Sequence, residues 1–239
     1  SPIEAVEGLI DMPRIKDLDF RFHPTLLHLS GGSLGPGESC SFSVDLQVPS
    51  GMDAGSYTNV TSDLLTFGLP LAPPATADLV LAVDFGDAPG PFSTLLANDG
   101  ARHAPSGLYL GATIDVETDA QPDISATGDD LNNLDDEDGI AFPATMALGQ
   151  SVPLAVTASA TGLLNAWIDF NGNGDWTDAG EQVYTDQPVS AGLNTLALNI
   201  PLTAVTGDVY ARFRLDSSGG LADTGFAQDG EVEDYRITL

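Results

Sequence analysis

Short runs of alternating polar and apolar residues, separated by turn residues, are the feature that most restricts the fold of this chain. Residues 40–48 alternate with a period of two and end at Pro49. No stretch has the periodicity of an amphipathic helix, and only 95–101 could form a short helical turn. Closely spaced short strands are typical of antiparallel sandwiches and not of β-α-β units. We therefore expect an all-β fold.

Further strands are expected along the chain, at 57–67, 78–83, 151–158, 163–170, 193–200, 209–215 and 235–239. Residues 115–139 contain too few apolar side chains for a sheet, so this segment is expected to be a long loop. Carboxylates become dense after Val83, and we place a domain boundary there. The prediction is two β-sandwich domains, immunoglobulin-like or jelly-roll-like, at 1–83 and 84–239, with long acidic loops.

The charge of the chain restricts its partners. There are 35 acidic and 7 basic residues, for a formal net charge of −28, while a hydrophobic content of 42% is enough to form a core. Such a field repels nucleic acids and anionic membranes, and no segment has the ~20 apolar residues needed to span a bilayer. We expect divalent cations to neutralise the charge. The single cysteine, Cys40, excludes an internal disulfide.

One short loop offers oxygen ligands at alternate positions, as calcium loops do: Asp169, Asn171, Asn173 and Asp175. Gly174 occupies position 6, as in an EF-hand, but position 12 is Gly180 and the glutamate follows as Glu181. No helix pattern flanks the loop, so we expect a calcium loop between strands. The alternative is a polar hairpin that uses Asn-Gly turn chemistry.

A second candidate site lies in the acidic run at 129–138. Its candidate ligands are Asp129, Asp130, Asp135, Asp136 and Asp138, and Glu137 lies among them. Five acids elsewhere in the chain are expected to converge on the same ions: Asp84, Asp87, Glu231, Glu233 and Asp234. The alternative is a solvated, mobile charge run.

Catalysis is not expected. Residues 31–35 match the G-x-S-x-G pattern, but Pro36 and Gly37 follow it where a nucleophile elbow needs a helix. His23 and His28 lack further zinc ligands at suitable spacing. Arg212 and Arg214 alternate with apolar residues, so both should face one side of a strand, to pair with carboxylates or to cover the sheet.

Several motifs carry a resemblance to a known family. They are DFGDAP at 84–89, NDGARH at 98–103, LYLG at 108–111, GDD at 128–130, DDEDG at 135–139, WIDFNGNGDW at 167–176 and GEVEDY at 230–235. In this order they make residues 84–239 resemble the GEVED domain of large bacterial secreted and cell-surface proteins. Residues 29–44 are similar to part of an immunoglobulin-like surface-protein repeat. The resemblance implies β-sandwich structure and exposure at the cell surface.

Together these observations predict a non-enzymatic, calcium-stabilised structural or adhesive module that is extracellular or at the cell surface. Its expected partners are calcium ions and neighbouring copies or other surface-protein domains. One alternative is a filament subunit, joined through a donor strand from 1–29 by β-augmentation. Another is a carbohydrate-binding module, which would need an exposed platform formed by Trp167, Trp176 or Tyr184.

Overall fold

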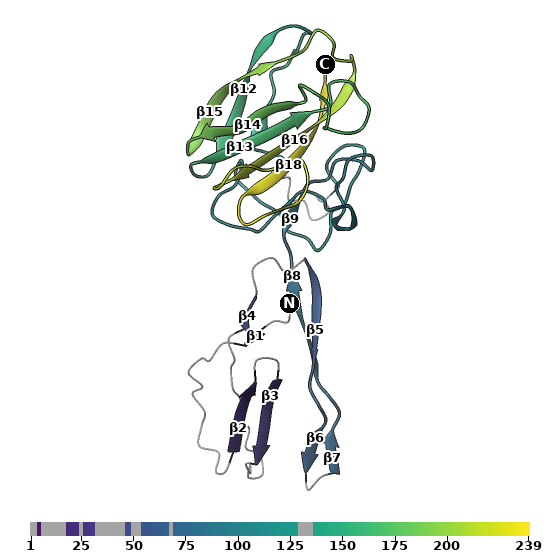
Figure 1. Cartoon of the computed structure of the whole chain (residues 1–239), viewed down its shortest axis with the longest axis vertical. Coiled ribbons are helices and arrows are strands. Elements are labelled where there is room, and N and C mark those ends of the chain that lie inside the picture. Colours follow the sequence, from purple (N-terminus) through teal and green to yellow (C-terminus); the bar gives the residue numbers. More distant parts are fainter. Residues whose placement is uncertain are drawn as a thin grey trace. The chain divides into compact units, whose positions relative to one another are not determined.

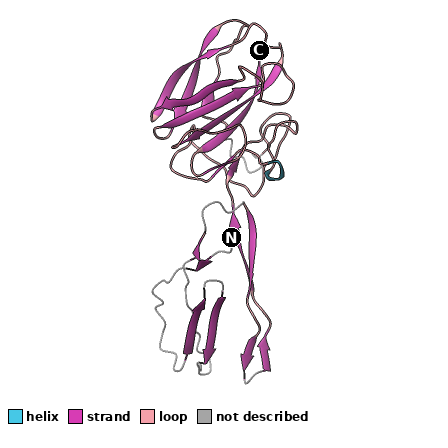
Figure 2. Cartoon of the chain, in the orientation of Figure 1, coloured by secondary structure: helices cyan, strands magenta, loops and turns pink. Residues whose placement is uncertain are grey.

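The chain is built from strands and loops. A computed structural model describes residues 4–5, 18–23, 26–31, 46–48, 54–66, 69–128 and 136–239. Within these residues the only helical element is a single turn, η1 (Leu96–Asn98), inside the segment expected to hold one (Figure 2). The prediction of an all-β chain is confirmed. The residues form two compact units, Ser1–Asp53 and Ala54–Leu239.

The N-terminal unit contains two antiparallel strand pairs among its described residues. The strand β1 (Glu4–Ala5) pairs with β4 (Leu46–Gln47), and β2 (Leu18–His23) pairs with β3 (Leu26–Gly31). The hairpin β2–β3 aligns Phe20 with Leu29. Most of the predicted strand at 40–48, the turn at 32–35 and Cys40 lie outside the described residues.

The C-terminal unit begins with an extended ribbon. The strands β5 (Gly55–Val60) and β8 (Thr76–Leu81) are antiparallel, and β6 (Leu64–Thr66) pairs with β7 (Leu69–Ala72) between them. The expected strand at 57–67 is therefore divided between β5 and β6, and the expected strand at 78–83 corresponds to β8 with shifted ends.

Two larger sheets share the main hydrophobic core of this unit (Figure 1). One has three strands in the order β11 (Ile140–Ala141), β12 (Ser151–Ala158) and β15 (Gly192–Asn199). The other has four strands in the order β14 (Gln182–Val189), β13 (Gly162–Ile168), β16 (Asp208–Asp216) and β18 (Glu231–Thr238). This arrangement is consistent with a β-sandwich.

The core follows from the period-two pattern of the strands. In β12, Leu154 and Val156 are fully buried while Ser151 and Pro153 are exposed. Phe213 and Leu215 of β16 enter the same core from the four-stranded sheet. Each such side chain contributes about 1.5–3 kcal/mol on burial, so the alternation drives the two sheets together.

The other face of the four-stranded sheet is covered too. A small sheet of β17 (Phe226–Ala227), β10 (Arg102–His103) and β9 (Asp84–Phe85) lies in this covering layer. Its strand β10 runs parallel to β17 and antiparallel to β9. Trp167 of β13 packs in a separate cluster with Phe92 of the same layer. Polar residues of β16 on this face are therefore buried.

Two strands differ from the sequence expectation. β14 was not predicted, because it contains Pro188 and buries only Tyr184 and Val189, so its alternation is weak. β18 begins at Glu231 and not at Tyr235. The segments 115–128 and 136–139 contain no strand beyond the bridge of Val83 with Glu117, as expected of a loop.

No helix among the described residues is both long enough and apolar enough to cross a membrane.

Candidate metal centre

Three buried carboxylates meet where the covering layer contacts the four-stranded sheet. Asp84 is on β9, Asp136 is on the loop before β11, and Glu231 is the first residue of β18. One carboxylate oxygen from each lies within 4.8 Å of the others, and all three side chains are buried. Two ligands of one calcium ion lie at most about 5 Å apart, since each bond is 2.3–2.6 Å long. These three residues, here called the buried trio, can therefore share one ion.

Backbone amides orient the trio. The Val232 amide donates to Asp84 Oδ2 (2.6 Å), the Asp115 amide donates to Asp136 Oδ2 (2.8 Å), and the Leu110 amide donates to Glu231 Oε2. Glu231 Oε1 is buried and has no hydrogen-bond partner among the described residues. A buried oxygen without a partner costs free energy, and a cation would satisfy it.

Two more carboxylates lie around the trio. Glu233 Oε1 accepts a hydrogen bond from the Gly139 amide (2.8 Å), and its Oε2 accepts one from the Tyr235 hydroxyl (3.0 Å). Asp138 Oδ1 accepts one from the Ala112 amide (2.8 Å), and this side chain is exposed.

The acids of this centre are difficult to ionise together. Burial, then repulsion from Glu231, raises the pKa of Asp84 well above its ordinary value. Burial, then Glu233 and Asp136, raises the pKa of Glu231 to about 10. Burial, then Asp138 and Asp136, raises the pKa of Glu233 to about 8. A divalent cation would remove this repulsion and hold all of these groups ionised.

The loop after β13 forms a second oxygen-rich site. Asp169 lies at its start, buried, and its carboxylate accepts hydrogen bonds from the amides of Gly172 (2.6 Å), Asn173 (3.2 Å) and Gly174 (2.9 Å). The Asn171 side-chain oxygen accepts from the Asn173 amide (2.9 Å). These local bonds bend the chain around its own side-chain oxygens, as Asn and Asp do in turns.

The same pattern continues along the loop. The Asn173 side-chain oxygen accepts from the Asp175 amide (3.0 Å), and Asp175 Oδ1 accepts from the Thr177 amide and hydroxyl (both 2.8 Å). The two bonds to Thr177 lower the pKa of Asp175. The loop therefore orders its side-chain oxygens through its own backbone.

Asp175, Asp178 and Glu181 present carboxylate oxygens within 4.8 Å of one another. Glu181 is 3% exposed, and its Oε1 has no hydrogen-bond partner among the described residues. Burial is the largest cause that raises the pKa of Glu181. Glu181 comes one residue too late for the last ligand of an EF-hand loop. It still reaches the loop because β14 begins directly after it.

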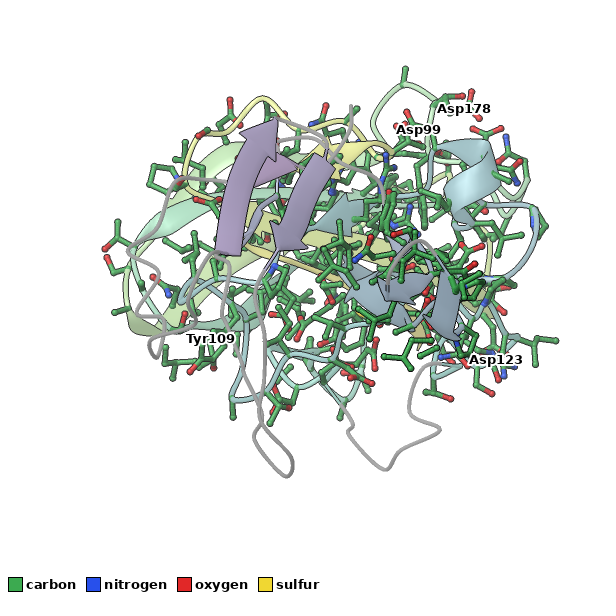
Figure 3. All side chains as sticks on the ribbon, turned by 90° about the horizontal axis from the view of Figure 1, so that it is seen from below. Asp99, Tyr109, Asp123 and Asp178 are labelled. Atoms are coloured by element: carbon green, nitrogen blue, oxygen red, sulfur yellow. The ribbon has the colours of Figure 1, made fainter. Side chains whose placement is uncertain are left out.

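Asp178 was missed at the sequence level. The side-chain amides of Asn171 and Asn173 both donate to its Oδ2 at 2.7 Å. It lies at the outer edge of the unit, exposed to solvent (Figure 3). The sequence signal that could have identified Asp178 was its spacing, because it lies three residues after Asp175 and three residues before Glu181.

Other residues predicted as ligands lie apart from these two groups. Asp234 is bound to Arg212 through two hydrogen bonds on the covered face of the sheet. Asp87 is buried and accepts from the Gly128 amide (2.5 Å), which holds the end of the acidic loop. Asp129, Asp130 and Asp135 lie outside the described residues.

Arg212 and Arg214 lie on one face of β16, as expected, and both are completely buried. The guanidinium of Arg212 also lies over the Trp176 ring, 4.5 Å from its centroid. Arg214 donates to His103 Nε2 (3.0 Å) and to three carbonyl oxygens of the segment before β17, those of Ala222, Thr224 and Gly225. The two arginines thus attach the covering layer to the sheet.

The aromatic residues proposed for a sugar platform are buried. Trp167 is 4% exposed, Trp176 is 3% exposed and Tyr184 is 8% exposed. Stacking against a sugar ring requires an accessible aromatic face, and none of these three provides one.

The donors of both groups are carboxylates, with amide oxygens beside the second group. Hard cations such as calcium take six to eight oxygen ligands of this kind, whereas zinc prefers nitrogen and sulfur. The residues therefore fit calcium. They would hold an ion between segments that are distant in sequence, and the ion would supply positive charge there.

Comparison with known proteins gives one family match. The chain matches no curated protein and no solved structure. Residues 163–238 match the family model of the GEVED domain. The matched part contains the whole loop site and, from the buried trio, Glu231. This match supports the assignment of a GEVED domain in the C-terminal part of the chain.

Proposed function

We propose that this chain is a non-enzymatic, calcium-stabilised structural or adhesive module of a bacterial surface or secreted protein. The observation that carries the proposal is the convergence of Asp84, Asp136 and Glu231, with oxygens within 4.8 Å of one another in a buried position. Each of the three belongs to a different segment. One ion between them would join β9, the acidic loop and β18.

Burial makes a cation the most effective partner for these groups. Removing a carboxylate from water is costly unless it is paired, coordinated or protonated. Among the described residues, no lysine or arginine forms an ion pair with Asp84 or Glu231. Calcium suits the site better than magnesium, because magnesium retains several waters and this centre is closed to solvent.

The loop site gives independent support. Its carboxylates, Asp175, Asp178 and Glu181, also lie within 4.8 Å of one another, and its side-chain oxygens are ordered before any ion binds. Pre-ordering lowers the entropic cost of binding.

A structural role is favoured over a catalytic one. Catalytic metal sites keep an open position for water or substrate. The members of the buried trio are each at most 3% exposed, so a substrate has no access to an ion held there. The clustered acids therefore favour a stabilising role.

The setting outside the cell is part of the proposal. It is supported by the net charge of −28, which requires abundant cations, and by the GEVED match at 163–238. In the same proposal, residues 1–83 form an immunoglobulin-like sandwich and 84–239 form a second sandwich.

A filament subunit is the second candidate. Within the described residues, β5 and β8 pair only with each other. The tip of this ribbon exposes Leu64, Leu65, Leu69 and Leu71 by 56–68%. Open edges and exposed apolar side chains favour strand addition from a neighbour.

Most of the candidate donor, 1–29, lies outside the described residues. Electron microscopy that finds only single particles, with and without calcium, would count against assembly.

Thermal unfolding with and without calcium tests the main proposal. Both tryptophans lie in the C-terminal unit, so their fluorescence reports its unfolding. At about 100 times Kd, calcium should contribute about 2.7 kcal/mol per ion, and this corresponds to roughly 5–10 °C in Tm. Magnesium at the same concentration is the control and should give a smaller shift. An equal Tm in calcium and in metal-free buffer would overturn the proposal.

A further inference from the structure

Two Asn-Gly pairs stand next to each other in the loop site, Asn171-Gly172 and Asn173-Gly174. In such a pair, the backbone nitrogen of the glycine can attack the Asn side-chain carbonyl carbon. A five-membered succinimide forms and ammonia leaves, and water then opens the ring to aspartate or isoaspartate. Glycine hinders this attack least because it has no side chain. Asn is accordingly among the thermolabile residues.

The fold requires both glycines. Gly172 has φ +71° and Gly174 has φ +93°, in the left-handed region that side chains disfavour. A Cβ on Gly174 would also lie 2.8 Å from Pro91 Cβ. The loop therefore retains the two most labile dipeptides of the chain for conformational reasons.

Asp169 holds the attacking nitrogen of both pairs. Its Oδ1 accepts from the Gly172 amide (2.6 Å), and its Oδ2 accepts from the Gly174 amide (2.9 Å). Attack requires the glycine nitrogen to lose its proton and to approach the Asn side chain. A buried carboxylate bonded to each N–H opposes both steps, because it directs the N–H away and repels the negative charge that deprotonation creates.

The leaving groups are restrained as well. The side-chain nitrogens of Asn171 and Asn173 donate to Asp178 Oδ2, and their oxygens accept from backbone amides two residues later. Both asparagines are nevertheless exposed to water. If the loop opened, the two asparagines would lose these hydrogen bonds while their side chains are already exposed to water.

We propose that Asn171 and Asn173 are deamidation sites, and that Asp169 protects both of them while the loop is closed. Each event consumes one water and releases one ammonia. It replaces a neutral amide with a carboxylate, and the isoaspartate product adds a methylene to the backbone of the loop. Protection depends on hydrogen bonds of the protein alone and operates without calcium.

Peptide mapping of the metal-free protein tests this inference. The full chain is incubated at mildly alkaline pH, folded and in urea, and aspartate and isoaspartate are measured at both positions. Deamidation at 171 and 173 should be many-fold slower in the folded chain. Equal rates in the folded and the urea-unfolded chain would overturn the proposal.

Substitutions separate the role of Asp169 from general loss of negative charge. Asp169→Ala should raise both rates several-fold, toward the unfolded value, and Asp169→Asn should give intermediate rates because it keeps an acceptor without the charge. Asp63→Ala is the matched control, because it removes the same charge from an exposed position on the ribbon, outside the loop site, and should leave the rates unchanged. Melting curves establish that each variant is folded. If Asp169→Ala is unfolded, Asp169→Asn decides: a rate equal to wild type in a folded variant would overturn the protective role. Because no calcium is present, this outcome is independent of the proposed calcium function.

Discussion

Arg212 and Asp234 form a two-point ion pair in which both side chains are closed to solvent. Arg212 Nε donates to Asp234 Oδ1 (2.7 Å), and Nη2 donates to Oδ2 (2.6 Å). Asp234 Oδ2 also accepts from the Ala88 amide (2.8 Å), so one carboxylate joins β16, β18 and the covering layer. Within the GEVEDY motif at 230–235, successive acids thus have different tasks. Glu231 and Glu233 lie at the candidate metal centre, and Asp234 holds an arginine.

The first prediction concerns this pair. Asp234→Ala leaves a buried guanidinium without its anion, and we expect a loss of about 3–5 kcal/mol in the free energy of unfolding. The measurement is urea unfolding followed by tryptophan fluorescence in excess calcium. Asp208→Ala breaks the exposed Arg236–Asp208 pair and should have a much smaller effect. Equal losses in the two variants would show that burial of the pair adds nothing.

The second prediction separates Glu231 from Asp234. Glu231→Gln keeps the shape of the side chain but removes one charge from the buried trio. The calcium-induced rise in Tm should shrink, while the part contributed by the loop site remains. The Tm of the metal-free protein at neutral pH should rise, because burial raises the pKa of Glu231 to about 10, and folding of the wild type must take up a proton that the Gln variant does not need.

Asp63→Asn is the control for this variant. It removes the same charge from an exposed position on the ribbon, and it should keep the whole calcium response. A full calcium response in Glu231→Gln would exclude Glu231 as a ligand.

Much of the fold could be predicted because period-two patterns are local. β12 has the predicted bounds, and β15 and β16 begin and end within one residue of them. β14 could not be predicted in this way, because it is held by pairing with β13 more than by its own pattern. The start of β18 was missed for a similar reason: its acids are tolerated in a strand only because distant groups such as Arg212 receive them.

The candidate site was accessible to sequence reasoning only in part. The oxygen ligands of the loop lie close in sequence, so their spacing indicated a common site. The partners of Glu231 are distant from it in sequence, Asp84 by 147 residues and Asp136 by 95. No local pattern shows that Asp84 meets Glu231 while Asp234 faces the opposite side of the strand. Which face of β18 each acid occupies depends on the alternation of side chains along that strand, and no strand was predicted from the sequence at 231–234.

The third prediction concerns pH. In metal-free protein the folded pKa of Glu233 is raised to about 8 and that of Glu231 to about 10, above the ordinary value of 4.5. The folded state therefore binds more protons than the unfolded state between about pH 4.5 and 8, and stability should fall as pH rises through this window. Calcium competes with these protons, so saturating calcium should weaken or reverse the trend. Urea midpoints from pH 5 to 8, with and without calcium, measure both slopes.

Glu231→Gln supplies the control for this slope. It removes one of the titrating groups, and the metal-free dependence on pH should become shallower than in the wild type. An unchanged slope would mean that the dependence comes from the surface charge of the chain and not from the buried carboxylates.

The fourth prediction separates backbone strain from steric conflict in the loop site. Gly174 and Gly180 have nearly the same backbone angle, φ +93° and +96°, but a Cβ at 174 would meet Pro91 Cβ at 2.8 Å, whereas one at 180 would meet nothing within 4 Å. Gly180→Ala should therefore cost only the left-handed strain, about 1–2 kcal/mol. Gly174→Ala should cost clearly more and should also weaken calcium binding, because relief of the contact displaces the loop from Pro91. Urea unfolding and calcium titration of the two variants measure the difference. Equal losses would show that the loop moves away from Pro91 without cost, and that the contact does not hold the site in place.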